Sequence, residues 1–191
     1  MILIIMICFV LLLCIDFDRA KLADLVSLLS GRDFETREFK EDIVEDSYNR
    51  LREGIKNNLL MNINFNQFVL AIKGAGYKSR KQLGSQMTLD FAYLLYLKLL
   101  NDSEIPHDQI KHHVQKWFVL STLTGRYVGS PESVMSRDIR LMNEKGFINF
   151  FNEVESSVLS DTFWTITLPQ SLETTLQIAR PLIRFLLRKL T

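Results

Sequence analysis

Proline, glycine and cysteine are all scarce in this 191-residue sequence. With only four prolines and eight glycines, the chain has few helix-breaking residues, and this favours long helices over a strand-and-turn architecture. The two cysteines, Cys8 and Cys14, would lie about 9 Å apart along one helix axis, which is too far for a disulfide. Three histidines, without a CxxC pair or an HExxH motif, argue against a structural metal.

Signature motifs of common enzyme classes are also missing. The sequence has no phosphate-binding GxxxxGK[ST] run, no dinucleotide-binding glycine signature and no serine-hydrolase elbow. The hydrophobic content of 47% instead indicates a globular chain with a sizeable core. The net charge of +1 conceals locally basic stretches at 73–81, 111–116, 126–140 and 180–189. Such stretches attract phosphates in some proteins and are solvated faces in others.

Hydrophobic periodicity predicts an all-α protein arranged as an irregular multi-helix bundle. Apolar residues recur at helical spacing at 18–30, 39–55, 89–100, 106–124 and 147–158, and further helices start at Asn64 or Asn66 and at Pro131. The 89–100 segment is apolar on nearly all sides, so we expect it at the centre of the bundle. The alternation in Phe163–Leu168 is typical of a short extended segment, and Ser171 is placed to cap a final helix.

The first part of the chain, residues 1–15, is almost wholly aliphatic and uncharged. It is shorter than the roughly 20 residues that span a bilayer, and it lacks the basic start and small-residue cleavage site of a secretory signal. We therefore interpret residues 1–15 as an apolar helix that is either buried in a core or used as a membrane anchor. The remainder divides into a helical domain at 16–158 and a divergent C-terminal segment with a terminal helix at 159–191.

A polar corner between two helices is the best candidate for binding an anion. The first helix ends near Gly125, and the next begins with Ser130 as its N-cap and Pro131 at its first position. Free amides in the first turn of a helix attract phosphate groups. The candidate contacts to phosphate or DNA are Lys116, Arg126, Ser130, Arg137 and Arg140.

A structural interpretation of the same corner is also open. Arg126 can pair with a carboxylate such as Asp138 or Glu132 instead of with a phosphate. In that case the Tyr127 ring packs inward and Ser130 serves only as the N-cap. The residue types at the corner are compatible with both interpretations.

The run Leu123–Ser133, preceded by Trp117 and followed by Asp138–Arg140, resembles the helical half of the domain of unknown function 262 family. Two earlier runs, Phe17–Leu25 and Gly31–Arg37, resemble one branch of that family. The family includes GmrSD-type modification-dependent restriction endonucleases and related phage-defence proteins. The structural motif within the resemblance comprises Trp117, Gly125, Tyr127, Gly129, Pro131 and Asp138.

Members of this family carry an upstream ParB-like nucleotide-hydrolysing domain, marked by Asp-Gly-Gln-Gln-Arg, and often a downstream HNH-type nuclease region. Neither motif occurs in this sequence. The resemblance therefore implies a cytoplasmic, non-catalytic helical region that helps to position DNA or nucleotide beside a ParB-like or nuclease domain supplied in cis or in trans. It implies no cofactor in this chain, and a nucleotide and a divalent metal in a full-length parent. The alternative is a stand-alone helical interaction protein, associated with a membrane through residues 1–15.

Overall fold

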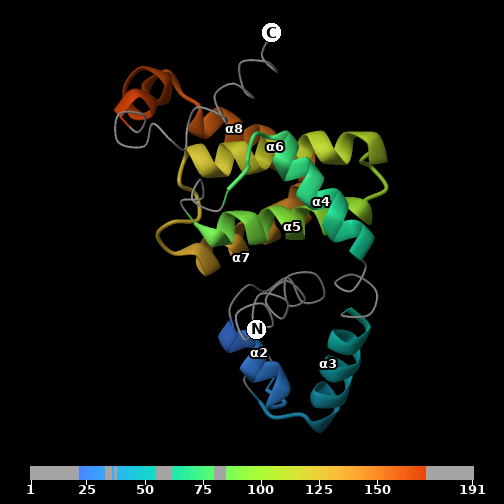
Figure 1. The fold of residues 1–191 in the computed structure, drawn as a ribbon. Helices are drawn as coiled ribbons and strands as arrows, with labels where there is room; N and C mark the ends of the chain where they lie inside the picture. The colour runs from blue at the N-terminus through green and yellow to red at the C-terminus, as the bar shows by residue number, and fades with distance from the viewer. Residues whose placement is uncertain (1–21, 33–35, 37, 55–61, 80–84, 171–191) are drawn as a thin grey trace.

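The computed structural model describes residues 22–32, 36, 38–54, 62–79 and 85–170, and every regular element in these ranges is helical (Figure 1). The elements are α2 (Leu22–Leu29), α3 (Glu41–Gly54), α4 (Asn62–Gly74), α5 (Gln86–Leu100), α6 (His107–Leu123), α7 (Pro131–Lys145), α8 (Phe147–Val158) and the π-helix η3 (Phe163–Thr167). The predicted all-α, irregular bundle is thereby confirmed. Helix α4 begins two residues before the earlier of its two predicted starts.

Some sequence-based expectations fall on other parts of the chain. The apolar segment at 1–15 and the terminal helix predicted after Ser171 both lie outside the described residues. The proposed division between 158 and 159 coincides with the last residue of α8. Among the helices in the described ranges, none combines the length and the apolar character that crossing a membrane requires.

Helix α5 is the central element of the bundle, as its uniformly apolar sequence predicts. All residues from Phe91 to Leu97 are buried. Helix α6 runs alongside α5, and α4 crosses both (Figure 1). At the start of α5, the Ser85 hydroxyl oxygen accepts a hydrogen bond from the Met87 amide at 3.2 Å, and the same hydroxyl donates to the Tyr127 carbonyl at 2.9 Å. One N-cap therefore also ties α5 to the loop that follows α6.

Helix α6 is held between α5 and α8 by aromatic packing. The Trp117 ring centroid lies 5.8 Å from that of Phe91 on α5 and 5.1 Å from that of Phe150 on α8. Buried Gln115 donates from Nε2 to the Ala71 carbonyl of α4 at 2.8 Å. Helix α6 thus fixes the positions of three neighbouring helices.

Three helices end in the same glycine-dependent motif. After α6, the Gly125 amide bonds to the Thr122 carbonyl at 3.4 Å and the Arg126 amide bonds to the Ser121 carbonyl at 3.1 Å. This is the Schellman pattern, which satisfies carbonyls that a helix end leaves free. Gly125 adopts a φ of 62° in it, and equivalent bonds surround the positive-φ glycines that end α2 and α4. The turn after α6 therefore has a defined backbone conformation, which fixes the direction of the loop that leads to α7.

Two further pairs of helices that are neighbours in sequence, α7 with α8 and α2 with α3, also pack together. Gly146, at a φ of 76°, separates α7 from α8, and the Lys145 ammonium lies 2.7 Å from the Glu153 carboxylate across that junction. Helices α2 and α3 also lie side by side (Figure 1). Within the described ranges, the only pairing of extended backbone is an isolated bridge between Arg32 and Phe39.

The prediction of an extended segment at Phe163–Leu168 is wrong, because this part of the chain is helical. Residues 163–167 form η3, in which the Leu168 amide bonds to the Phe163 carbonyl. Phe163 and Leu168 are buried, whereas Trp164 and Ile166 are exposed. The two buried positions are five residues apart, which matches the hydrogen-bond spacing of a π-helix. Packing against the core thus overrides the two-residue alternation.

We predict that Gly125→Ala destabilises the bundle, whereas Gly129→Ala does not. At a φ of 62°, the new Cβ crowds the following carbonyl and costs about 1–2 kcal/mol. A Cβ at Gly129 meets no atom within 4 Å, and Gly129 has no positive φ. Urea unfolding of both variants measures the difference in unfolding free energy. Equal effects at the two glycines would contradict the role assigned to Gly125 in ending α6.

Candidate functional site

The corner between α6 and α7 is built around the buried carboxylate of Asp138. The Arg126 guanidinium binds it through two hydrogen bonds, Nε to Oδ2 and Nη2 to Oδ1, both at 2.7 Å. The Tyr127 hydroxyl donates to Oδ2 at 2.9 Å. The Asp138 side chain is 0% exposed and that of Arg126 is 12% exposed. Three donated hydrogen bonds therefore satisfy a carboxylate that has no contact with solvent.

Aromatic rings enclose this network. The Tyr127 ring stacks on Phe91 of α5 with centroids 4.9 Å apart. The Arg126 Cζ lies 5.3 Å from the centre of the Trp117 ring, within the range of a cation–π contact. Since Ser85 also donates to the Tyr127 carbonyl, the short loop contacts α5, α6 and α7 at once.

The surroundings of Arg126 and Tyr127 keep both groups protonated. Burial by itself lowers the pKa of Arg126, but hydrogen bonding to Asp138 and its negative charge outweigh burial, so the pKa is raised. Burial, assisted by the charge of Asp138, holds the pKa of Tyr127 well above its usual value of 10.0. Both side chains are therefore hydrogen-bond donors at neutral pH, and the Tyr127 phenol is not available as a base.

The other cationic candidates lie outside this network. Arg137 is 53% exposed, with its Nε 3.6 Å from Asp138 Oδ1, so it lies at the edge of the corner. Arg140 is 69% exposed, and its Nε lies 3.8 Å from Glu144 Oε1. The Lys116 ammonium lies 5.9 Å from the centre of the Phe151 ring on α8. The structure thus brings Arg126 into the corner and directs Arg140 and Lys116 to other neighbours.

The start of α7 has the local form that its sequence predicts. Ser130 occupies the N-cap position and Pro131 the first helical position. The Ser130 residue is exposed, and its hydroxyl makes no capping hydrogen bond. Of the two corner glycines, only Gly125 has a backbone conformation that favours glycine, and Gly129 is exposed.

Sequence reasoning missed two residues that support the corner. Ser85 has the signature of a helix N-cap, and Phe91 that of a core residue, but neither pattern indicates a contact with Tyr127. The hydrogen bond from Ser85 joins positions 42 residues apart. Such a contact follows from the packing of α5 against the loop, for which hydrophobic periodicity carries no signal.

No family model matches this chain, and no curated protein or solved structure is significantly similar to it. Within the described part of the chain, no group of three or more His, Cys, Asp or Glu side chains is arranged to hold a metal ion. The interpretation of the corner therefore rests on its geometry and on the residues that compose it.

We predict that Asp138→Asn lowers the unfolding free energy by about 3–5 kcal/mol, because the largely buried Arg126 guanidinium loses its counter-charge. Arg140→Gln is the control: its side chain is 69% exposed and pairs with Glu144 rather than with Asp138, so we expect a change within about 0.5 kcal/mol. Chemical denaturation followed by circular dichroism measures both. A loss below about 1 kcal/mol for Asp138→Asn would show that the ion pair does not stabilise the corner.

We predict that Tyr127 contributes to a loss of stability in alkali. Its pKa is higher in the folded chain than in the unfolded chain, so its contribution is intact below about pH 10 and is lost as pH rises through the folded pKa. Tyr127→Phe removes this titration and should flatten the decline in unfolding free energy, by at most about 1.4 kcal/mol per pH unit.

Denaturation of the wild type and of Tyr127→Phe between about pH 9 and 11.5 tests this effect. Tyr48→Phe provides the control because Tyr48 is 63% exposed. Burial also raises the pKa of Tyr96, which remains in both variants, so some decline persists. Identical pH slopes for wild type and Tyr127→Phe would contradict the prediction.

Proposed function

We propose that this chain is a helical, non-catalytic region of a restriction or phage-defence protein of the GmrSD type, and that it helps to position DNA. The proposal begins with the resemblance of Leu123–Ser133 to that family. The observation that carries it is that Trp117, Tyr127 and Asp138, all part of the resemblance, meet in one packed network through Arg126. Motif residues that hold one another in place are typical of a scaffold.

The chemistry of the corner supports a structural role over a catalytic one. A general base must reach a substrate proton at hydrogen-bond distance with a free lone pair. The Asp138 carboxylate is 0% exposed and already accepts hydrogen bonds from Arg126 and Tyr127. Tyr127 in turn is fully buried and retains its proton. The ionisable groups of the corner are therefore committed to one another.

The solvent side of α7 is the surface that we propose for contact with DNA. Arg137 and Arg140 are three residues apart on the helix, so their side chains are neighbours on its surface. The two guanidinium groups are 53% and 69% exposed, and their Nε atoms lie 3.6 Å and 3.8 Å from carboxylate oxygens, which is beyond hydrogen-bond distance. Both guanidinium groups can exchange these partners for backbone phosphates, which bind arginine in two-pronged geometry.

The resemblance also defines the partner that we propose. A ParB-like nucleotide-hydrolysing domain or a nuclease domain, in cis or in trans, would supply the catalytic groups together with their nucleotide and divalent metal. The ParB-like partner is recognisable by Asp-Gly-Gln-Gln-Arg in the same or a neighbouring reading frame. The assembly would act on DNA in the cytoplasm.

We predict that the double variant Arg137→Gln/Arg140→Gln binds duplex DNA more weakly than the wild type. Each phosphate contact contributes about one unit to the slope of log affinity against log salt, so that slope should fall by about two. Fluorescence anisotropy with labelled duplexes, with and without modified bases, measures affinity at several salt concentrations.

The control is Arg50→Gln/Arg52→Gln, which removes the same charge from two exposed positions of α3. We expect it to retain most of the affinity and the salt slope. Unchanged binding in the α7 variant, or equal losses in both variants, would exclude a specific DNA-positioning role for α7. Circular dichroism of each variant shows that the helical fold is retained.

A further inference from the structure

His113 on α6 is a titratable side chain that lies against α8. Its ring is inclined at 76° to the Phe147 ring, with the two centroids 5.3 Å apart. The side chain is partly exposed, but its Nε2 atom is buried and has no hydrogen-bond partner among the described residues. A buried polar nitrogen without a partner is costly, and a buried positive charge without one costs more. The contact therefore favours the neutral imidazole over the protonated one.

The cationic groups around His113 add to this preference. On α6, the His112 ring centroid lies 6.0 Å away, and Lys116 follows three residues later on the same helix surface. The Lys116 ammonium lies 5.9 Å from the centre of the Phe151 ring. Phe151 and Phe147 are neighbours on α8, with centroids 5.8 Å apart, so this aromatic pair already faces one cation.

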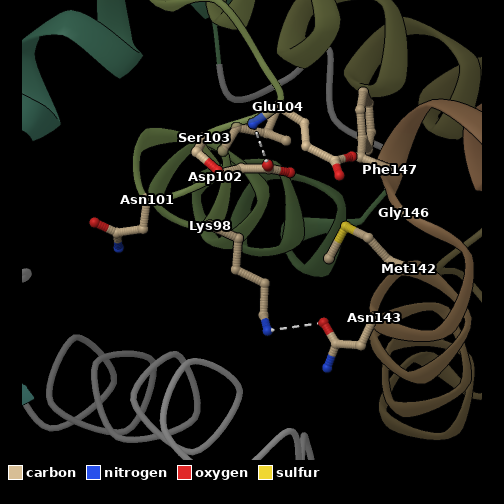
Figure 2. Close-up of a pocket in the computed structure, with 10 residues that line it drawn as sticks. Lys98, Asn101, Asp102, Ser103, Glu104, Met142, Asn143, Gly146 and Phe147 are labelled. Atoms are coloured by element: carbon tan, nitrogen blue, oxygen red, sulfur yellow. Dashed lines mark hydrogen bonds between the residues drawn. The ribbon is translucent and has the colours of Figure 1, made fainter.

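The acidic side chains on the neighbouring elements do not offset these charges. Asp102 and Glu104 belong to the turn after α5, and Figure 2 shows this turn beside the junction of α7 and α8. Neither carboxylate bonds to His113 Nε2, which has no partner. The two acids of α8, Glu153 and Glu155, lie in the second half of that helix, away from the residue that contacts His113.

These surroundings lower the pKa of His113 from its usual value of 6.5. Burial is the largest cause, and the charges of His112 and Lys116 add to it. In the unfolded chain the imidazole titrates at about 6.5. Because the folded pKa is the lower of the two, the contact is fully stable above the unfolded value. Its stability is lost as pH falls below that value towards the folded pKa.

Movement of Phe147 is the step that would bring water to a protonated imidazole. An open cavity of about 510 Å³ lies between the end of α5 and the junction of α7 with α8, and Phe147 is one of its lining residues (Figure 2). The same ring contacts His113. Helix α6 is also bonded to α4 through Gln115 and packed on α5 through Trp117. We therefore expect α8 to move, because α6 is held by other neighbours.

We propose that His113 makes the contact between α6 and α8 acid-sensitive. Protonation of the imidazole moves α8 away from α6 and exposes Phe147 and Phe151, while α4, α5 and α6 stay packed. The bundle thereby contains one helix that is released in mild acid. This switch uses neither of the arginines in the DNA-binding proposal.

Hydrogen–deuterium exchange of the 191-residue chain, measured at about pH 7.5 and about pH 5.5, tests this release. Protection of each segment is corrected for the intrinsic exchange rate at each pH. Uptake of one proton limits the loss of protection over this range to about tenfold. We predict a loss of about three- to tenfold in α8 and of less than about twofold in α5.

His113→Phe and His113→Gln cannot take up a proton and should abolish the loss in α8. His107→Gln removes an exposed histidine from the same helix and should keep it. Unchanged protection of α8 between the two pH values, an undiminished loss in the His113 variants, or equal losses in α5 and α8 would each overturn the proposal.

NMR titration of the wild-type His113 imidazole provides a readout that needs no variant. A pKa at or above 6.5 in the folded chain would also overturn the proposal. Because DNA binding is measured with different residues, failure here leaves the DNA result intact.

Discussion

The free-energy cost of burying the Asp138 carboxylate is the constraint on which the rest of this structure depends. A carboxylate shielded from water is stable only when donors surround it, and Arg126 and Tyr127 provide them here. Both donors come from the loop between α6 and α7, so this loop has to adopt one conformation. Gly125 permits that conformation because its φ of 62° turns the chain at the end of α6. A buried charge, a loop and a helix end thus depend on one another.

The same constraint determines which surfaces α7 presents. With Asp138 and Ile139 fixed in the interior, Arg137 and Arg140 are held towards solvent. The C-terminal end of α7 then forms part of a cavity whose rim carries acidic groups. One helix therefore has a buried face and an exposed basic face, and both follow from how the buried carboxylate is oriented.

Local sequence signals were sufficient for most of the helices. The limits of α8 follow from its periodicity and the preceding glycine, and the central position of α5 follows from its uniform apolar character. The pairing of Arg126 with Asp138 was one of two open interpretations, because an arginine at the corner can bind either a phosphate or a nearby carboxylate. Three features depend on how distant segments pack, which hydrophobic periodicity does not encode. They are the hydrogen bond between Ser85 and Tyr127, the cavity, and the π-helix η3.

The Asp138 network also selects the register in which α7 docks. A slip of one helical turn would move the carboxylate about 5.4 Å from Arg126 while apolar neighbours still covered part of it. The unpaired charge would cost several kcal/mol, whereas apolar residues such as Ile139 and Met142 would tolerate many of the alternative positions. Burial of apolar side chains packs α7 against the bundle, and the ion pair determines the position of α7 along its own axis. A single buried acid in this helix thus removes an ambiguity that an entirely apolar face would leave.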